Sequence, residues 1–145
     1  MARRLLFGTL LLAALAWARP ASASAQLGLG ADWLVDPQDG AFQLTLAGHR
    51  QVARSLQVGG RIGALLLTSP SHLGVPIDAS LRLRLGRFYV EGLAGPWILF
   101  DSGDAVRLHA AVGFGLVARG GVSVGLEVGY LDPTSMLGLR VAFPF

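Results

Sequence analysis

The sequence contains no cysteine, which excludes both disulfide bonds and thiolate metal sites. Charged residues make up only 14% of the chain, against about 25% in an average soluble domain. Outside the N-terminus there is no uninterrupted apolar run of about 18 residues, so we expect no helix that crosses a membrane. Yet 52% of the residues are hydrophobic and the mean hydropathy is +0.54. Apolar residues spread through short segments leave a membrane barrel or an unusually apolar sandwich.

An excess of charge of one sign is also absent once the N-terminal segment is set aside. Two arginines precede the apolar run 5–16, and Ala-Ser-Ala at 23–25 offers an A-x-A cleavage site. We therefore predict a cleaved signal peptide over residues 1–25 with export through the Sec pathway, an uncleaved anchor being the alternative. The mature domain, 26–145, keeps nine basic and nine acidic residues. This balance gives no electrostatic case for binding nucleic acid.

What the mature chain does contain is alternation, which is clearest in its last nine residues, 137–145. Apolar residues at every second position indicate a strand with one apolar face. The same pattern recurs eight times between short turns, and the even count puts both ends of the domain on one side. A bulge is expected where proline interrupts the fifth strand at 95–96. The expected strands are 27–35, 42–49, 55–66, 77–86, one beginning at 88, 106–116, 122–130 and 137–145.

The number of apolar side chains decides which face points outward. Eight strands enclose a narrow interior, and the chain has more than about thirty large apolar side chains, too many for that space. We therefore predict an all-β, eight-stranded antiparallel up-and-down transmembrane β-barrel whose apolar face meets lipid. Small and charged residues then fill the lumen. Besides the pairs described next, the phase of the strands turns these polar residues inward: Asp32, Gln43, Arg61, Asp78, Arg84, Arg107 and His109.

Charges inside the lumen should be paired, because a buried unpaired charge is costly. A two-residue turn after the fourth strand sets Arg82 directly opposite Glu91. A four-residue loop at 132–135 sets Glu127 opposite Arg140. We predict these as two lumenal ion pairs.

The aromatic residues are expected to form girdles at the two membrane interfaces. If the chain starts on the periplasmic side, one group lies near that rim and the other near the outer rim. The periplasmic group is Phe88, Phe143 and Phe145, and the outer group is Trp33, Phe42, Trp97, Phe100 and Tyr130.

With this pattern, residues 26–145 resemble the small eight-stranded outer-membrane β-barrel proteins of Gram-negative bacteria. The most specific match is the closing strand, which looks like the assembly signal of that family and departs from it only at Pro144. The resemblance implies an integral outer-membrane protein, surrounded by outer-membrane lipids and lipopolysaccharide. It also implies the barrel assembly machinery and periplasmic chaperones as partners during biogenesis. The residues of this signal are Leu137, Leu139, Val141, Phe143 and Phe145.

Some barrels of this size modify lipids, so the three histidines need an interpretation. His109 is followed by two alanines and lacks the His-x-Ser spacing of the lipid A deacylases, which favours a place in the lumenal polar network. His49 is expected to be solvated beside a periplasmic turn. His72 is the best catalytic candidate, in a loop at 69–74. Its possible partners in acyl transfer are Ser69, Ser71, Asp101 and Asp104.

The function that these patterns favour is structural or envelope-related. We expect a monomer whose lumen is plugged by charged pairs, without a wide porin-like pore, an enzymatic activity, a cofactor or a metal. One alternative is a lipid A-modifying acyl hydrolase or transferase that uses loop residues near His72, and a second is a narrow channel for small solutes. A soluble lipid-binding calyx would need the opposite pattern, with a polar exterior and an apolar interior.

Overall fold

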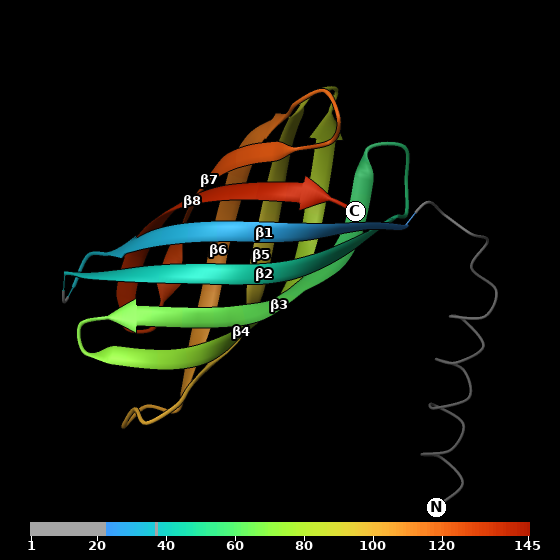
Figure 1. The fold of residues 1–145 in the computed structure, drawn as a ribbon. Coiled ribbons are helices and arrows are strands. Elements are labelled where there is room, and N and C mark those ends of the chain that lie inside the picture. The colour runs from blue at the N-terminus through green and yellow to red at the C-terminus, as the bar shows by residue number, and fades with distance from the viewer. Residues whose placement is uncertain (1–22, 37) are drawn as a thin grey trace, which may run out of the picture.

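Alternating residues form a closed barrel of antiparallel strands in the computed structural model, which describes residues 23–36 and 38–145 (Figure 1). Each strand pairs with its neighbour in sequence, and β8 closes the barrel against β1. The all-β, eight-stranded, up-and-down architecture is therefore confirmed. The strands in the described residues are β1 (Ala23–Leu34), β2 (Asp39–Gln51), β3 (Leu56–Thr68), β4 (Ser71–Leu85), β5 (Phe88–Leu99), β6 (Val106–Val117), β7 (Ser123–Leu131) and β8 (Thr134–Pro144).

The predicted signal peptide lies almost entirely in residues 1–22, outside the described residues. Residues 23–25 already belong to β1 and pair with β2, and the cleavage site after Ala25 stays a prediction. In the described part of the chain, no helix is long and apolar enough to cross a membrane.

The apolar face of every strand points away from the barrel axis, as the alternation predicts. On β2, for example, Leu44 is exposed while its neighbours Gln43 and Thr45 are buried. A slip of one residue in any strand would exchange the two faces and move charges onto the outer surface. The alternation therefore specifies both the direction of each side chain and the register.

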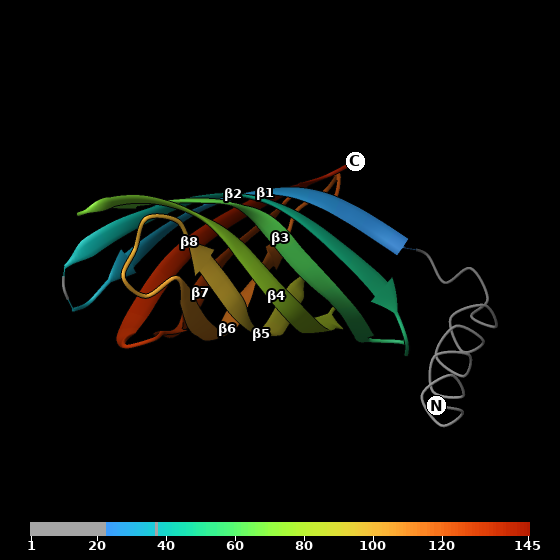
Figure 2. The ribbon, with the colours of Figure 1, turned by 90° about the horizontal axis from the view of Figure 1, so that it is seen from below.

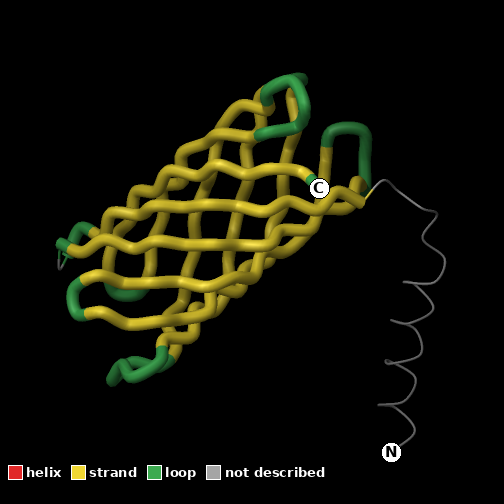
Figure 3. The backbone as a smooth tube through the Cα atoms, viewed as in Figure 1, coloured by secondary structure: helices red, strands yellow, loops and turns green. Residues whose placement is uncertain are grey.

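The connections gather at two ends of the barrel, which Figure 3 shows as two groups of loops. We call one end the terminal rim, because it carries the start of β1, the end of β8 and the turns 52–55, 86–87 and 118–122. The opposite end, with the connections β1–β2, β3–β4, β5–β6 and β7–β8, is the loop rim. Figure 2 shows the strands running obliquely between the two rims. Both rims have short connections, so little of the described chain projects beyond the barrel wall.

Three details of the predicted strands are wrong. The loop expected at 69–74 shrinks to the turn 69–70, because β4 already begins at Ser71. The loop expected at 132–135 is a two-residue turn, since Leu131 pairs directly with Thr134. The bulge expected at 95–96 is also absent.

The alternation continues through Pro96 because proline is accommodated without an extra residue. The β4–β5 ladder omits this position, yet the register is the same on either side of it, and the β5–β6 register is constant from Phe88 to Ile98. Pro96 itself points outward. The residues beyond it therefore keep their phase, which sends Trp97 into the lumen.

Close packing in the narrow interior makes some inward glycines irreplaceable, and Gly95 tests this. A Cβ atom at Gly95 would fall on the backbone carbonyl oxygen of Ile77, whereas a Cβ at Gly92 on the outer face of β5 would meet nothing within 4 Å. Because the obstacle is backbone, we expect Gly95→Ala to lower the free energy of unfolding by about 1–3 kcal/mol. Gly92→Ala is the matched control and should be neutral or slightly stabilising. Denaturant unfolding of both variants makes the comparison, and equal effects would contradict it.

Candidate functional site: two polar networks in the lumen

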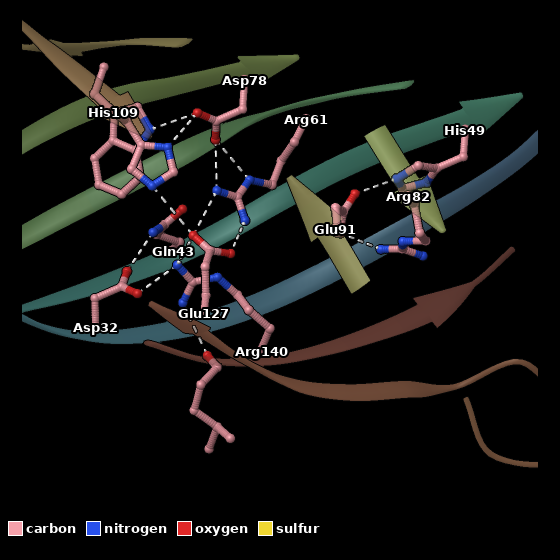
Figure 4. A network of polar contacts seen from close by, with 12 residues as sticks. Asp32, Gln43, His49, Arg61, Asp78, Arg82, Glu91, His109, Glu127 and Arg140 are labelled. Atoms are coloured by element: carbon pink, nitrogen blue, oxygen red, sulfur yellow. Dashed lines mark hydrogen bonds and ion pairs between the residues drawn. The ribbon is translucent and has the colours of Figure 1, made fainter. Parts of the chain in front are cut away.

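The buried charged side chains of the lumen, with several polar and aromatic neighbours, form two networks, and Figure 4 shows most of their members from close by. The central network crosses the barrel and takes one residue from each of the eight strands, β1 to β8. The second network, nearer the terminal rim, joins β1, β2, β4 and β5. The central network consists of Asp32, Gln43, Arg61, Asp78, Trp97, His109, Glu127 and Arg140, and the terminal-side network of Gln26, His49, Arg82, Tyr89 and Glu91.

Arg61 is the hub of the central network. It is buried, and Asp78 lies directly opposite it in the β3–β4 ladder. Its Nε and Nη2 donate to Asp78 Oδ2 at 3.0 and 2.7 Å. Its Nη1 and Nη2 also donate to Glu127 on the far wall, at 2.9 Å to Oε2 and 3.2 Å to Oε1. One guanidinium thus bridges two carboxylates across the barrel, an arrangement that suits its planar set of donors.

Arg140 connects Glu127 to Asp32. Arg140 Nη2 lies 2.6 Å from Asp32 Oδ1 and donates to Glu127 Oε1 at 3.1 Å. Gln43 Nε2 donates to the other oxygen of Asp32 at 2.5 Å. Because Asp32 is on β1 and Arg140 on β8, this contact crosses the strand pair that closes the barrel.

The register predicted for Glu127 and Arg140 is wrong, although the structure brings the two side chains together. Glu127 pairs with Gly138, because the β7–β8 turn has two residues where four were expected. The pair forms diagonally across the ladder. Arg140 reaches over Gly138, where an added Cβ would lie 2.7 Å from Arg140 Nη1, so the missing side chain leaves the path to Glu127 open.

His109 lies at the fully buried end of the central network. Its Nδ1 is 2.6 Å from Asp78 Oδ1, and its Nε2 is 3.5 Å from Glu127 Oε1, too far for a good hydrogen bond. The indole of Trp97 stacks on the imidazole with ring centroids 4.5 Å apart, and Trp97 Nε1 donates to Asp78 Oδ1 at 3.3 Å. The placement of Trp97 in the outer aromatic girdle is therefore wrong, since its side chain is 0% exposed and belongs to the lumen.

The terminal-side network is centred on Glu91. The structure places Arg82 directly opposite it, as a two-residue turn requires, with Arg82 Nη2 2.8 Å from Glu91 Oε2. Arg82 also stacks over the ring of Tyr89 at 4.5 Å and donates weakly to Gln26 Oε1 at 3.4 Å. His49 Nε2 lies 2.8 Å from Glu91 Oε1.

The expectation that His49 is solvated is wrong. Its residue is only 3% exposed, because β2 continues to Gln51 and the strand phase turns His49 inward. The glycine opposite it on β3, Gly59, has no side chain to compete for this space. The strand phase was a usable signal here, but the partner, Glu91 on the opposite wall, could not be read from neighbouring strands.

Two predicted lumenal residues join neither network. Arg84 is exposed at the terminal rim, and Arg107 is half-buried near the loop rim. Arg107 Nε has no hydrogen-bond partner among the described residues. Both have the inward phase, but they lie too near the ends of the barrel to reach the buried carboxylates.

An apolar plug toward the loop rim was missed by the sequence reasoning. Leu65 and Leu67 flank the outward Leu66, and their own side chains point into the lumen. The run of three leucines fits either phase, so the alternation alone could not identify them. The plug consists of Leu34, Ala41, Leu65, Leu67, Trp97, Leu99, Leu131 and Met136.

A small polar cavity of about 50 Å³ separates the two networks. Its wall includes Arg61, Arg82, Glu91, Glu127 and Arg140. A cavity of this size can hold only one or a few water molecules, and its charged wall would give them partners.

His72 is the second residue of β4 and half-buried, so its placement in a loop is wrong. Among the described residues it makes no hydrogen bond or ion pair with Ser69, Ser71, Asp101 or Asp104, because β4 starts earlier than expected and carries it onto the barrel wall. The structure therefore does not assemble the proposed acyl-transfer group around His72.

Of the predicted assembly-signal residues, Leu137, Leu139, Val141 and Phe143 lie on the outer face of β8, with Val141 half-buried, and Phe145 directly follows this strand. Pro144 faces Gln26 without an amide donor, and the next residue, Phe145, donates its N–H to Ala25 O at 3.2 Å. The pairing of β8 with β1 therefore continues past the proline.

No protein-family model matches the sequence, and no curated protein matches it. Several solved structures, however, match the fold of this chain. A de novo designed transmembrane β-barrel superposes with a TM-score of 0.68 at 12% identity, over 88% of this chain and 98% of the design. The outer membrane enzyme PagL gives 0.68 at 12% identity, over 83% and 99%. The Yersinia pestis outer membrane protein Ail gives 0.54 at 13% identity, over 86% and 100%. At these identities the likeness establishes the fold, that of small outer-membrane barrels.

Proposed function

We propose that this chain is an integral outer-membrane β-barrel with a structural or envelope-related role, and that it is neither a wide pore nor an enzyme. The observation that carries the proposal is a barrel with an apolar outer surface whose lumen is crossed by buried ion pairs. A soluble barrel would place its apolar side chains inside and its ion pairs at the surface.

The outer surface supports a membrane location. Large apolar side chains are exposed on all eight strands, and an arginine on this face at the bilayer midplane would cost about 2–4 kcal/mol. Exposed aromatic side chains lie near both rims, which suits the two interfaces of a bilayer. Those near the loop rim are Trp33, Phe42, Phe100 and Tyr130, and those toward the terminal rim are Phe88, Phe114, Phe143 and Phe145.

The lumen supports a closed barrel. An ion crossing from one rim to the other would have to displace Arg82 from Glu91, then Arg61 from its two carboxylates, and finally the apolar plug. Breaking a buried pair by removing one partner typically costs about 3–5 kcal/mol, so this route carries a large barrier. Within residues 23–36 and 38–145, no contact favours a narrow channel or acyl transfer at His72.

The same proposal includes export and assembly. Residues 1–25 would serve as a Sec signal peptide, and the outer face of β8 would be recognised by the barrel assembly machinery. Lipopolysaccharide and phospholipids would surround the inserted barrel, and the terminal rim would face the periplasm.

Conductance measurements test the closed lumen. We expect the purified chain, reconstituted in planar bilayers, to give no steady current in salt, because both networks and the plug cross its lumen. Its insertion is checked beforehand by the shift in gel migration between heated and unheated samples. A steady current that scales with salt concentration would contradict the closed lumen, and a chain that shows no migration shift and needs no detergent would contradict the membrane barrel.

A further inference from the structure

The charges outside the lumenal networks are sorted between the two ends of the barrel. At the terminal rim, the charged side chains among the described residues are all arginines, and none is acidic. The loop rim carries aspartates and one half-buried arginine, Arg107. The arginines of the terminal rim, which we call the basic rim, are Arg50, Arg54, Arg84, Arg87 and Arg119, and the aspartates of the loop rim are Asp36, Asp39, Asp101, Asp104 and Asp132.

Most guanidinium groups of the basic rim are available to an outside partner. Arg54, Arg84, Arg87 and Arg119 are exposed, and their side chains make no ion pair with any described residue. Arg50 is half-buried and has contacts of its own. Like charges gathered at one rim, with no acidic side chain beside them, repel one another. An anionic partner bound there would reduce this repulsion.

The position of the basic rim indicates which anion it would meet. Arg87 lies in a two-residue turn between Leu85 and Phe88, two of the most exposed apolar residues on the outer surface. The arginines thus begin where the apolar surface ends. Turns of this length cannot carry them far beyond the hydrocarbon layer, so they lie at the level of the lipid headgroups.

A cleft in the basic rim gives one place where an anionic group would fit best. It has a volume of about 290 Å³ and is lined by Gln51, Arg54, Ser55, Gln57, Arg84 and Gly86. Two hydrogen bonds hold its walls together: the backbone Arg84 N donates to Ser55 O at 2.7 Å, and the side-chain Gln51 Nε2 donates to the backbone Arg54 O at 3.0 Å. Two guanidiniums and two amides around one cleft are the donors that recognise a phosphate group.

We propose that the basic rim binds the phosphate groups of anionic phospholipids in the leaflet it faces, with the cleft at Arg54 and Arg84 as the strongest contact. This inference rests on the proposed membrane location. The acidic loop rim has no such affinity, so the two ends of the barrel prefer different headgroups. The selectivity would hold the barrel at a defined depth and orientation.

Lipid retention measures the proposed selectivity. The full chain is inserted into vesicles of phosphatidylcholine with a minor fraction of phosphatidylglycerol, extracted in mild detergent, and examined by native mass spectrometry. We expect phosphatidylglycerol to be retained over phosphatidylcholine by about tenfold relative to the vesicle composition. Arg54→Gln/Arg84→Gln should lower this ratio more than any other paired arginine variant of the basic rim, whereas the matched loop-rim variant Asp101→Asn/Asp104→Asn should leave it unchanged.

Insertion is scored separately, in vesicles of phosphatidylcholine alone, by the heat-dependent gel shift. Failure to insert there would contradict the proposed function, whereas insertion without any headgroup preference would contradict only the present inference. Loss of the preference in the presence of free inorganic phosphate at equal concentration would also contradict it, by indicating a site for soluble anions. If the first variant fails to fold, Arg87→Gln/Arg119→Gln, confined to exposed turns, should still lower the ratio, and an unchanged ratio would overturn the proposal.

Discussion

Replacing Arg61 with methionine is expected to lower the free energy of unfolding by about 3–5 kcal/mol. The substitution keeps most of the side-chain volume but removes four hydrogen bonds, two to Asp78 and two to Glu127. Both carboxylates stay buried after the substitution, with fewer partners for their negative charge. Asp78 keeps its contact with His109, and Glu127 keeps its contact with Arg140. Denaturant unfolding in lipid vesicles, followed by tryptophan fluorescence, measures the loss.

Arg107→Met is the matched control for this prediction. Arg107 has the same inward phase on β6, but its Nε has no partner and no ion pair joins it to any described residue. We expect a change of less than about 1 kcal/mol. If the two variants lose similar stability, the central network does not hold the barrel together, and the cost at Arg61 comes from packing alone.

An arginine introduced at Val112 is expected to cost about 2–4 kcal/mol, whereas one introduced at Leu116 should cost only about 0–1 kcal/mol. Both residues point outward from β6, with similar exposed fractions of 54% and 50%. Val112 lies near the middle of the strand and Leu116 one residue from its end at the terminal rim. In a bilayer, only the first arginine must be held in hydrocarbon.

The difference between these two variants separates a membrane barrel from a soluble one. On a surface that faces water, both substitutions would be nearly neutral, because an exposed arginine is fully solvated at either height. Unfolding in vesicles gives the two free energies, and equal values would contradict the proposed membrane location. Because both positions lie on the outer face of the same strand, the two variants differ mainly in their distance from the terminal rim.

Much of the fold could be predicted because most strands carry an apolar residue at every second position. This alternation is visible in short windows of sequence and indicates the phase of a strand. The two-residue turn at 86–87 then placed Arg82 opposite Glu91 by counting alone. Local pattern and turn length were sufficient wherever the contact joined neighbouring strands.

Contacts across the lumen could not be predicted in this way. Arg61 meets Glu127, and His49 meets Glu91, only because the sheet closes with a particular tilt, which no single hairpin reveals. The proline at 96 hid the inward phase of Trp97, since a proline in a strand more often marks a break. The register of Glu127 depended on a turn whose composition suited two lengths. Each of these errors concerns a feature that depends on how the whole barrel closes and that a single strand or hairpin does not determine.

The contact between Arg140 and Asp32 has a consequence for how the barrel opens. It spans the seam between the last strand and the first, and Glu127 ties the same arginine to Arg61 on the opposite side. A partly opened barrel would leave these buried charges without their partners, so we expect such species to be poorly populated. The contact between Arg140 and Asp32 joins the first and last strands from inside the barrel. We therefore expect the chain to unfold in one cooperative step and not by separation of one strand after another from its ends.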